Sequence, residues 1–394
     1  MSLIKVLVVE NEQDILESYD DTIKEHNEKK GNTQIKLIKC ETYEKALDAI
    51  KNDFFDAAIV DLSLSNPQSS EGNQILQNIF GVARYPIYIV SGQLQMLDLS
   101  TIEKNDFICM IDKGDSEYPF SKLFEEIQNI FQTGITKILG NRGIINNHLD
   151  QIFWAHLSQT KQHWIGQSGG ESKNLEQIVS RYTLMHLLEY IQLDNSSGQI
   201  EYHDPSEMYI KPIIKEGLYP GIILKKNDTQ ENFLILTPAC DLHQSDKCDC
   251  LLLVKLNPFF QINELVDLKS KNKSLVDSYK AEKDPEKQKV LKNKVEKNES
   301  ALKSKISDYI GNNRSHRYYF LPNFLDFSAS IIDFQDIISI DLVEEKNYTK
   351  FMSITWPFFK DIQSRFSSYY ARQGAPDFNK KALQDSYFTQ FLEE

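Results

Sequence analysis

The chain has 394 residues, 41% hydrophobic and 26% charged, a composition typical of soluble globular proteins with two or three domains. Its formal charge of −13 argues against nucleic acid as a partner. The longest apolar runs are strand-sized, so we expect no membrane span. The first residues lack the pattern of a signal peptide, and the five cysteines lack the spacing of a disulfide scaffold. We therefore expect a cytoplasmic protein.

Residues 1–135 alternate between short apolar runs and amphipathic segments. The predicted strands are 3–9, 34–39, 56–61, 86–91 and 107–112. The predicted helices are 14–29, 42–52, 72–80, 94–104 and 120–131. Five strand–helix units of this length predict an α/β fold, a flavodoxin-like, doubly wound parallel sheet of five strands. In such a sheet the functional site lies beyond the C-terminal strand ends.

The rest of the chain divides into a predicted helical linker, 136–195, and an α+β C-terminal domain, 196–394. The segment Gln167–Gly170 interrupts the linker, and 175–191 has helical periodicity. Short β-like runs separated by turn residues predict either a small barrel or a mixed α+β domain. These runs are 221–224, 233–237, 250–256, 318–321 and 337–343.

A Lys-rich insertion at about 261–311 interrupts the C-terminal domain. Asp284 and Pro285 at its middle supply an N-cap and a first-turn proline, so we predict two antiparallel helices joined near residue 284. The mixture of Lys with Glu and Asp favours a solvated hairpin over a surface for nucleic acid. A last helix is predicted from Thr355 to about Arg372.

Polar residues follow the ends of four predicted strands in the first domain. Glu10–Glu12 follow the first strand, Asp61 ends the third, Ser91 ends the fourth and Lys113 follows the fifth. These ends converge on one crevice in a doubly wound sheet. Phosphoryl transfer to a carboxylate needs such a set: an exposed Asp, a divalent cation on oxygen ligands, a hydroxyl and a fixed positive charge.

Four stretches carry a resemblance to the receiver domains of bacterial two-component response regulators. They are V-L-V-V-E-N-E (Val6–Glu12), D-A-A-I-V-D-L-S-L (Asp56–Leu64), Y-I-V-S-G (Tyr88–Gly92) and C-M-I-D-K-G (Cys109–Gly114). The resemblance covers about residues 1–135 and includes the family's separations between the acceptor Asp, the hydroxyl residue and the Lys.

The resemblance implies a role for each of these side chains. Asp61 would accept a phosphoryl group from a histidine kinase or a phosphotransfer protein. Ser91 would hydrogen-bond a phosphoryl oxygen, and Lys113 would pair with the phosphoryl charge. The implied ligands of Mg²⁺ are Glu10, the side chain at Asn11, Asp61 and the backbone carbonyl of Ser63. Phosphorylation would bias a surface that contacts the linker, another signalling component or a second copy of the chain.

The chain departs from the family pattern at three positions. Asn11 stands where a metal-ligating acid is usual, which implies weaker Mg²⁺ binding unless Glu12 compensates. Gly114 follows the Lys where the family has Pro. Met110 replaces the aromatic switch residue, so output through another surface is expected.

Zinc ligation is one hypothesis for the second half. Cys240, His243, Cys248 and Cys250 offer four ligands within eleven residues, but their spacing is not a standard one. Cys250 begins an apolar strand, which favours a place in the core over zinc ligation. A Cys240 nucleophile with His243 as its base is a further, less favoured alternative.

Other histidines and arginines have simpler interpretations. Among the helical His156, His163 and His186, only His186, near Glu189, resembles a phosphotransfer histidine, and its apolar neighbours favour a half-buried structural role. Arg365 and Arg372 could bind a phosphate, with surface ion pairs as the default.

Several C-terminal strings resemble uncharacterised regions of receiver proteins in Detocs-type phosphorelay anti-phage systems. They are P-S-E-M-Y-I-K-P, T-P-A-C-D-L, Y-Y-F-L-P, I-I-D-F-Q-D-I and 357–374. This resemblance implies a phosphate sink or a regulator in antiviral defence. Two alternatives stay open: a receiver-gated effector enzyme with its active site in 196–394, and a degenerate receiver that serves as a scaffold.

Overall fold

The computed structural model describes residues 2–29, 33–64, 71–98, 105–140, 143–167, 172–193, 202–243, 249–372 and 378–393. The chain forms two compact units, 1–199 and 200–394, and each is described by itself. The finer boundaries at 135 and 195 stay predictions. No helix in the described ranges has the length and apolarity that crossing a bilayer requires.

The first unit contains the predicted five-stranded parallel sheet, in the order β2-β1-β3-β4-β5. This is the strand order of flavodoxin-like folds, so the fold prediction for the N-terminal third is confirmed. The strands are β1 (Ser2–Val9), β2 (Thr33–Cys40), β3 (Ala57–Val60), β4 (Ile87–Ser91) and β5 (Ile108–Asp112). The helices are α1 (Gln13–Lys29), α2 (Tyr43–Asn52), α3 (Glu71–Val82) and α4 (Phe120–Gln132).

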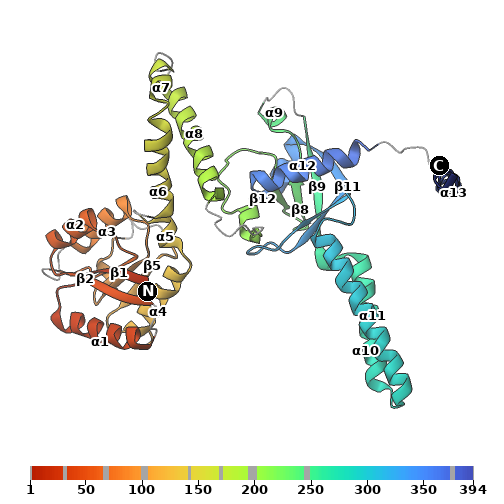
Figure 1. The fold of residues 1–394 in the computed structure, drawn as a ribbon. Helices are drawn as coiled ribbons and strands as arrows, with labels where there is room; N and C mark the ends of the chain where they lie inside the picture. Colours follow the sequence, from red (N-terminus) through yellow and green to blue (C-terminus); the bar gives the residue numbers. More distant parts are fainter. Residues whose placement is uncertain are drawn as a thin grey trace. The chain divides into compact units, whose positions relative to one another are not determined.

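Apolar residues on both faces of the strands hold the helices on both sides of the sheet. In β1, Val6 and Val8 belong to a core shared with α1 and α4, whereas Leu7 and Val9 belong to a second core shared with α2 and α3. Successive side chains of a strand point to opposite faces, so a continuous apolar run supplies both cores. Figure 1 shows α1 and α4 on one side of the sheet and α2 and α3 on the other.

The predicted helix over 94–104 differs from the structure. Only a 3-10 turn, Leu94–Met96, forms there, and residues 97 and 98 are not helical. Residues 99–104 lie outside the described ranges. The turn closes on backbone bonds from Met96 and Leu97, so the chain leaves the helical path after one turn.

The predicted linker is helical throughout its described part. Its elements are α5 (Ile135–Leu139), α6 (Ile144–Gln151), a π-helix η3 (Ile152–Leu157), α7 (Lys161–Gln167) and α8 (Ser172–Leu193). α6 and η3 pack against α8 as an antiparallel pair. The predicted interruption at 167–170 falls mostly outside the described residues.

The second unit is built on a seven-stranded antiparallel sheet in the order β10-β11-β9-β8-β7-β12-β6. Its strands are β6 (Tyr209–Ile210), β7 (Ile222–Lys226), β8 (Asn232–Ile235), β9 (Cys250–Pro258), β10 (Tyr318–Leu321), β11 (Ser330–Asp341) and β12 (Tyr348–Ile354). The order has two ends, so the mixed α+β alternative holds and the closed barrel does not. All five predicted strands are present, and β6 and β12 were not predicted.

Two helical features of the second unit match their predictions. α12 (Trp356–Tyr370) packs Phe359 and Ile362 on the core of the sheet. The insertion forms α10 (Asn263–Ala281) and α11 (Pro285–Ile310), which lie side by side in Figure 1. Asp284 caps α11 by accepting bonds from the N–H groups of Glu286 and Lys287. Four further short elements are η4 (Pro205–Met208), α9 (Ala239–Leu242), η5 (Phe259–Gln261) and η6 (Leu342–Asn347), and α13 (Lys380–Glu393) is the last described helix.

Candidate functional site

Four strand ends of the first unit bring the predicted site residues together. Glu10 and Asp61 follow directly on β1 and β3, and the N–H of Asp61 donates to the carbonyl of Val9 at 2.9 Å. Ser91 ends β4, and the N–H of Lys113, just beyond β5, donates to the carbonyl of Ser91 at 3.4 Å. The parallel register therefore places all four residues at one edge of the sheet.

The Lys113 ammonium lies among three carboxylates. Its Nζ is 2.7 Å from Glu10 Oε2, 2.9 Å from Glu12 Oε1 and 2.9 Å from Asp61 Oδ2. Glu10 is 1% exposed and Asp61 3% exposed, whereas Glu12 lies at the surface. Three carboxylates against one ammonium leave two negative charges uncompensated at this edge of the sheet, if all four groups are ionised.

Burial and these contacts shift the pKa values of two groups. Burial raises the pKa of the Glu10 carboxyl above its ordinary value, although Lys113 and the N–H of Glu12 oppose the shift. Burial lowers the pKa of Lys113, but its hydrogen bonds with Glu10, Asp61 and Glu12 outweigh that effect and hold the pKa above the ordinary value. Lys113 therefore keeps its charge throughout the physiological range.

The loop after β1 brings Glu12, rather than Asn11, into the set of carboxylates. Glu10 Oε1 accepts hydrogen bonds from the N–H groups of Asn11 and Glu12, both at 2.9 Å, which folds the loop back on itself. Ligand oxygens of Glu10, Glu12 and Asp61 all lie within 4.8 Å of one another, and the Asn11 side chain is exposed. Ligation at Asn11 stays a prediction.

The acidic cluster fits a hard divalent cation. Mg²⁺ and Ca²⁺ are bound by carboxylate and carbonyl oxygens, and the three carboxylates here are such ligands. Two negative charges remain beside Lys113, a number that one divalent ion would balance. In the described part of the chain this is the one cluster of three or more His, Cys, Asp or Glu side chains close enough to share a metal ion.

Asp61 is less accessible than the sequence led us to expect. An exposed nucleophile was predicted, but the carboxylate is almost fully buried. Lys113 Nζ lies on Oδ2 at 2.9 Å, and the N–H of Ser63 donates to Oδ1 at 3.3 Å. The contact between Asp61 and Lys113 joins residues 52 positions apart in the sequence, which strand periodicity does not reveal.

Ser91 and Gly72 shape the surroundings of Asp61. Ser91 is buried, and its Oγ accepts a bond from the N–H of Gln93 at 3.3 Å. At the start of α3, a Cβ added to Gly72 would lie 2.5 Å from the Cα of Leu62 and 2.6 Å from the carbonyl oxygen of Asp61. Only glycine lets α3 approach the backbone that carries Asp61 this closely.

Tyr19, on α1, is a neighbour of the site that the sequence analysis did not single out. Its ring is fully buried against Phe120 and Phe124, and its hydroxyl has no hydrogen-bond partner within the described ranges. Burial raises the pKa of Tyr19, and the charges of Glu10 and Asp61 raise it further. No sequence signal marks a buried tyrosine beside an acidic cluster.

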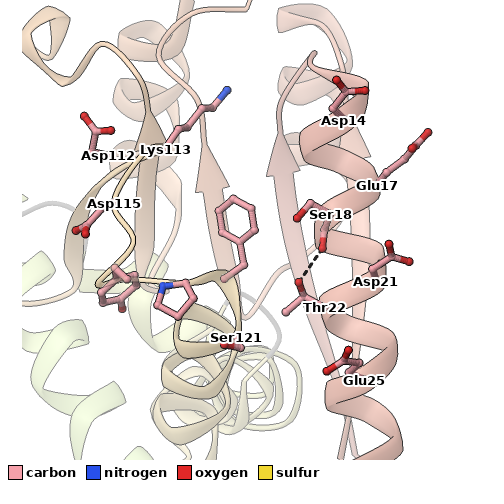
Figure 2. Close-up of a pocket in the computed structure, with 13 residues that line it drawn as sticks. Asp14, Glu17, Ser18, Asp21, Thr22, Glu25, Asp112, Lys113, Asp115 and Ser121 are labelled. Carbon is pink, nitrogen blue, oxygen red and sulfur yellow. Dashed lines mark hydrogen bonds between the residues drawn. The ribbon is translucent and has the colours of Figure 1, made fainter.

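An acidic groove lies beside the pocket, between α1 and the segment that leads from β5 into α4. Its volume is about 770 Å³. Figure 2 shows acidic side chains along α1 on one side and Lys113 with two aspartates on the other. The carboxylates that line it are Asp14, Glu17, Asp21, Glu25, Asp112 and Asp115. Its one lysine is Lys113, whose charge the buried carboxylates already compensate.

The candidate zinc ligands that the structure describes, Cys240, His243 and Cys250, do not gather at one point. His243 Nδ1 bonds the carbonyl of Ala239, and Nε2 contacts the Tyr219 hydroxyl at 3.2 Å, so both ring nitrogens have partners. Cys240 is exposed, and Cys248 lies outside the described residues. Cys250 is exposed and bonds Asp341 at 3.5 Å, so the alternative that places it in the core is wrong.

Neither Arg365, on α12, nor Arg372, just beyond its end, forms an ion pair with a carboxylate of the described residues. Arg365 donates to the carbonyl of Asn312 at 2.8 Å, and the Arg372 guanidinium lies 4.8 Å from the Tyr369 ring centroid. Three cavities among the described residues have linings that include none of Cys240, Asp241 and Arg372. The effector-enzyme alternative stays a prediction.

One prediction about the remaining side chains can be checked. His186 is half-buried, as predicted: its Nδ1 bonds the Tyr182 carbonyl at 2.9 Å, and its ring lies 4.8 Å from that of His156. His163 is exposed and its ring contacts Trp164. Met110, at the usual position of the aromatic switch residue, is exposed.

Of the comparisons with known proteins, only the one with solved structures gives matches. The chain matches no family model and no curated protein. A CheY-like receiver domain from Methanospirillum hungatei is 20% identical, covering 34% of this chain and 100% of that chain with a TM-score of 0.25. A CheY-like receiver domain from Methylobacillus flagellatus is 20% identical, covering 32% and 99% with a TM-score of 0.25. A signal receiver domain from Vibrio parahaemolyticus is 17% identical, covering 34% and 97% with a TM-score of 0.26. The flavodoxin-like fold assigned above rests on the strand order and parallel register of the sheet.

Proposed function

We propose that the first domain is a phosphoacceptor receiver in which Asp61 accepts a phosphoryl group from a phosphohistidine of a kinase or phosphotransfer protein. An Asp61 carboxylate oxygen attacks phosphorus, an O–P bond forms, and the N–P bond of the donor breaks. The imidazole that leaves carries away the bonding electron pair and takes up a proton from water. The product is an acyl phosphate with about two negative charges.

The observation that carries this proposal is the environment of Asp61. Its carboxylate ends a buried strand, 2.9 Å from an ammonium that stays charged and within 4.8 Å of two other carboxylates. Negative charge developing on the phosphoryl oxygens would be stabilised by Lys113, which is already positioned there. Ser91, at the adjacent strand end, has a buried hydroxyl that could donate to a phosphoryl oxygen.

The same proposal assigns the acidic cluster to Mg²⁺. Glu10, Glu12 and Asp61 would hold the ion, with the Ser63 carbonyl and the Asn11 side chain as further candidate oxygens. Bound there, the ion neutralises the crowded oxygens of the acceptor and the phosphoryl group. Glu12 would supply the carboxylate that the family has at the position of Asn11.

Access to Asp61 requires Lys113 to move. Its side chain is 12% exposed and bridges Glu10, Glu12 and Asp61 across the mouth of the pocket. A lysine side chain has four rotatable bonds, so its ammonium can move off Oδ2 without a backbone change. Binding of a divalent cation to the carboxylates would weaken their hold on the ammonium and favour that movement.

The donor protein would approach over the acidic groove beside the pocket. Charge complementarity there favours a donor with lysine or arginine on the approaching face. The finer role, a phosphate sink in antiviral defence, is supported by the sequence resemblance of the C-terminal strings. It predicts that the chain drains phosphoryl groups from a kinase and that Asp61→Asn abolishes the effect on the kinase.

The test is uptake of phosphate by the full chain with Mg²⁺, from radiolabelled acetyl phosphate and from a phosphorylated histidine kinase. We expect one phosphoryl group per chain, abolished in Asp61→Asn and retained in Asp112→Asn, a matched loss of an exposed carboxylate one residue before Lys113. Uptake by Asp61→Asn would contradict the proposal.

A second candidate function, a docking scaffold, is favoured by the near-complete burial of Asp61. If the pocket never opens, the groove and the sheet would serve only as a binding surface. Absence of label from either donor, together with normal folding, would select the scaffold.

A further inference from the structure

A cavity lies where the helical hairpin of α10 and α11 joins the sheet of the second unit (Figure 1). Its volume is about 480 Å³, and small-molecule sites in proteins span about 300–1,000 Å³. The end of β9, the start of α10, the end of α11 and the strands β10 and β11 contribute to its lining. All of these segments lie in the continuous described range 249–372. The proposed function makes no use of this cavity.

Two tyrosines and an arginine give the cavity flat, polarisable surfaces. The rings of Tyr309 and Tyr318 meet edge to face, with their centroids 5.8 Å apart. The Arg314 guanidinium lies 4.8 Å from the Tyr309 centroid and 5.7 Å from the Tyr318 centroid. Aromatic rings and guanidinium planes are the surfaces on which proteins stack nucleobases. The cavity therefore fits a ligand with a planar heteroaromatic part.

Two cations share one carboxylate at the same place. Arg314 Nη1 is 2.6 Å from Glu264 Oε2, and Lys305 Nζ is 2.9 Å from Glu264 Oε1. Both cations, Lys305 most strongly, lower the pKa of the Glu264 carboxyl, so these three groups together carry one positive charge. Arg317 and Asp333 form a separate pair, with Nε 2.6 Å from Oδ1. A guanidinium has five N–H donors, and donors of Arg314 that do not face Glu264 can bind a phosphate.

The Tyr309 hydroxyl is a buried polar group that a ligand can satisfy. The residue is 4% exposed, and its hydroxyl forms no hydrogen bond with another described residue. Burial raises the pKa of Tyr309, so the hydroxyl keeps its proton and can donate. Buried hydroxyl groups normally have a hydrogen-bond partner. A ligand in the cavity that Tyr309 lines would supply one.

Three amide side chains add hydrogen-bonding capacity to the lining. Asn257 Nδ2 donates to Asp336 at 2.9 Å, which leaves its Oδ1 as an acceptor. The side-chain amides of Gln261 and Asn263 form no hydrogen bond with a described residue. Amide side chains carry both a donor and an acceptor, as the edges of nucleobases do.

We propose that this cavity binds a mononucleotide, with the base against the tyrosine rings and the phosphate on Arg314. The Tyr309 hydroxyl and the amides bond the polar atoms of the base and the ribose. The bound nucleotide contacts the sheet and both helices of the hairpin, and so holds the hairpin on the sheet. This inference goes beyond the proposed function and does not depend on phosphorylation of Asp61.

The first test is calorimetric titration of the full chain, without Mg²⁺, with the four ribonucleoside 5′-monophosphates, their nucleosides and inorganic phosphate. The proposal predicts a dissociation constant of about 1–100 μM for at least one nucleotide. Its nucleoside and inorganic phosphate should each bind at least tenfold more weakly, because each lacks one half of the contacts. Absence of binding by every nucleotide at about 1 mM, or equal affinity of the nucleoside or of phosphate, would overturn the proposal.

The second test locates the site. Arg314→Met should raise the dissociation constant at least tenfold, and Glu264 keeps Lys305 as its partner in this variant. Tyr309→Phe keeps the ring, removes only the hydroxyl and should raise the constant about threefold to tenfold. The control is Arg372→Met, which removes a guanidinium 4.8 Å from the Tyr369 centroid, outside the cavity, and should leave the affinity unchanged.

Circular dichroism checks that all three variants fold. Wild-type affinity in Arg314→Met or in Tyr309→Phe, or an equal loss in Arg372→Met, would overturn the assignment. Asp61→Asn should bind the nucleotide as the wild type does, so failure of this proposal and failure of phosphoryl uptake at Asp61 are measured separately.

Discussion

The substitution Lys113→Met removes the positive charge that two buried carboxylates share. Glu10 and Asp61 are almost fully buried, so the loss leaves two like charges side by side without compensation. Breaking a buried ion pair by removing one partner costs about 3–5 kcal/mol. The contact with Glu12 adds at most about 1 kcal/mol, because that carboxylate is mostly exposed to solvent.

Protonation of Glu10 limits this loss at low pH. Burial already raises the pKa of Glu10 in the wild type, and without Lys113 it rises further. The folded variant then holds a proton that the unfolded chain has lost, so stability falls as pH rises from the ordinary carboxyl pKa toward the folded value. We therefore expect a destabilisation of about 3 kcal/mol near pH 8 and about 1 kcal/mol near pH 5.

Thermal unfolding measures the effect, with hydrogen exchange of the β1 and β3 amides to assign it to the first unit. For a unit of this size, about 3 kcal/mol corresponds to a fall in Tm of roughly 6–12 °C. The control is Lys45→Met, which removes an exposed pair with Glu41 and should change Tm by less than about 2 °C. An unchanged Tm in Lys113→Met, or a loss that is the same at both pH values, would refute the reasoning.

Three further predictions concern the cation, the backbone and the groove. Glu12→Gln should weaken Mg²⁺ binding about tenfold, whereas Asn11→Ala should weaken it less than threefold, because Glu12 rather than Asn11 lies in the cluster. Calorimetry measures both affinities, and a larger effect of Asn11→Ala would contradict the assignment. Gly72→Ala should lower the free energy of unfolding by about 1–3 kcal/mol, measured by thermal unfolding. The control is Gly92→Ala, because Gly92 has open space for a Cβ. Equal stability of the two variants would show that the close approach of α3 is unimportant. Glu17→Lys on α1 should slow phosphoryl transfer from a protein donor about tenfold but leave phosphoryl uptake from acetyl phosphate unchanged. Equal slowing with both donors would exclude docking of the donor over the groove.

The sheet of the first unit could be predicted because its strands carry their own signal. Continuous apolar runs such as Val6–Val9 predict strands buried on both faces, and their alternation with helices leaves few topologies. The residues at the strand ends then follow from the fold, since parallel strands share one C-terminal edge. The capping residues Asp284 and Pro285 marked the hairpin of the second unit in the same local way.

The parts that sequence missed depend on contacts between distant residues or on loop conformation. Burial of Asp61 depends on the reach of Lys113, and entry of Glu12 into the cluster depends on how the loop after β1 folds onto Glu10. Strand β12 went unpredicted because the apolar Phe351 stands next to the buried Met352, which interrupts the alternation of apolar and polar residues. The helix expected at 94–104 shows that local propensity does not decide where a helix ends.

The most direct measurement of the central claim is the identity of the residue that carries phosphate. After incubation with acetyl phosphate and Mg²⁺, borohydride reduces an aspartyl phosphate to homoserine, and tandem mass spectrometry locates it in the sequence. We predict homoserine at position 61 alone. Homoserine at another aspartate, or none in a chain that has taken up label, would contradict the assignment of Asp61 as the acceptor.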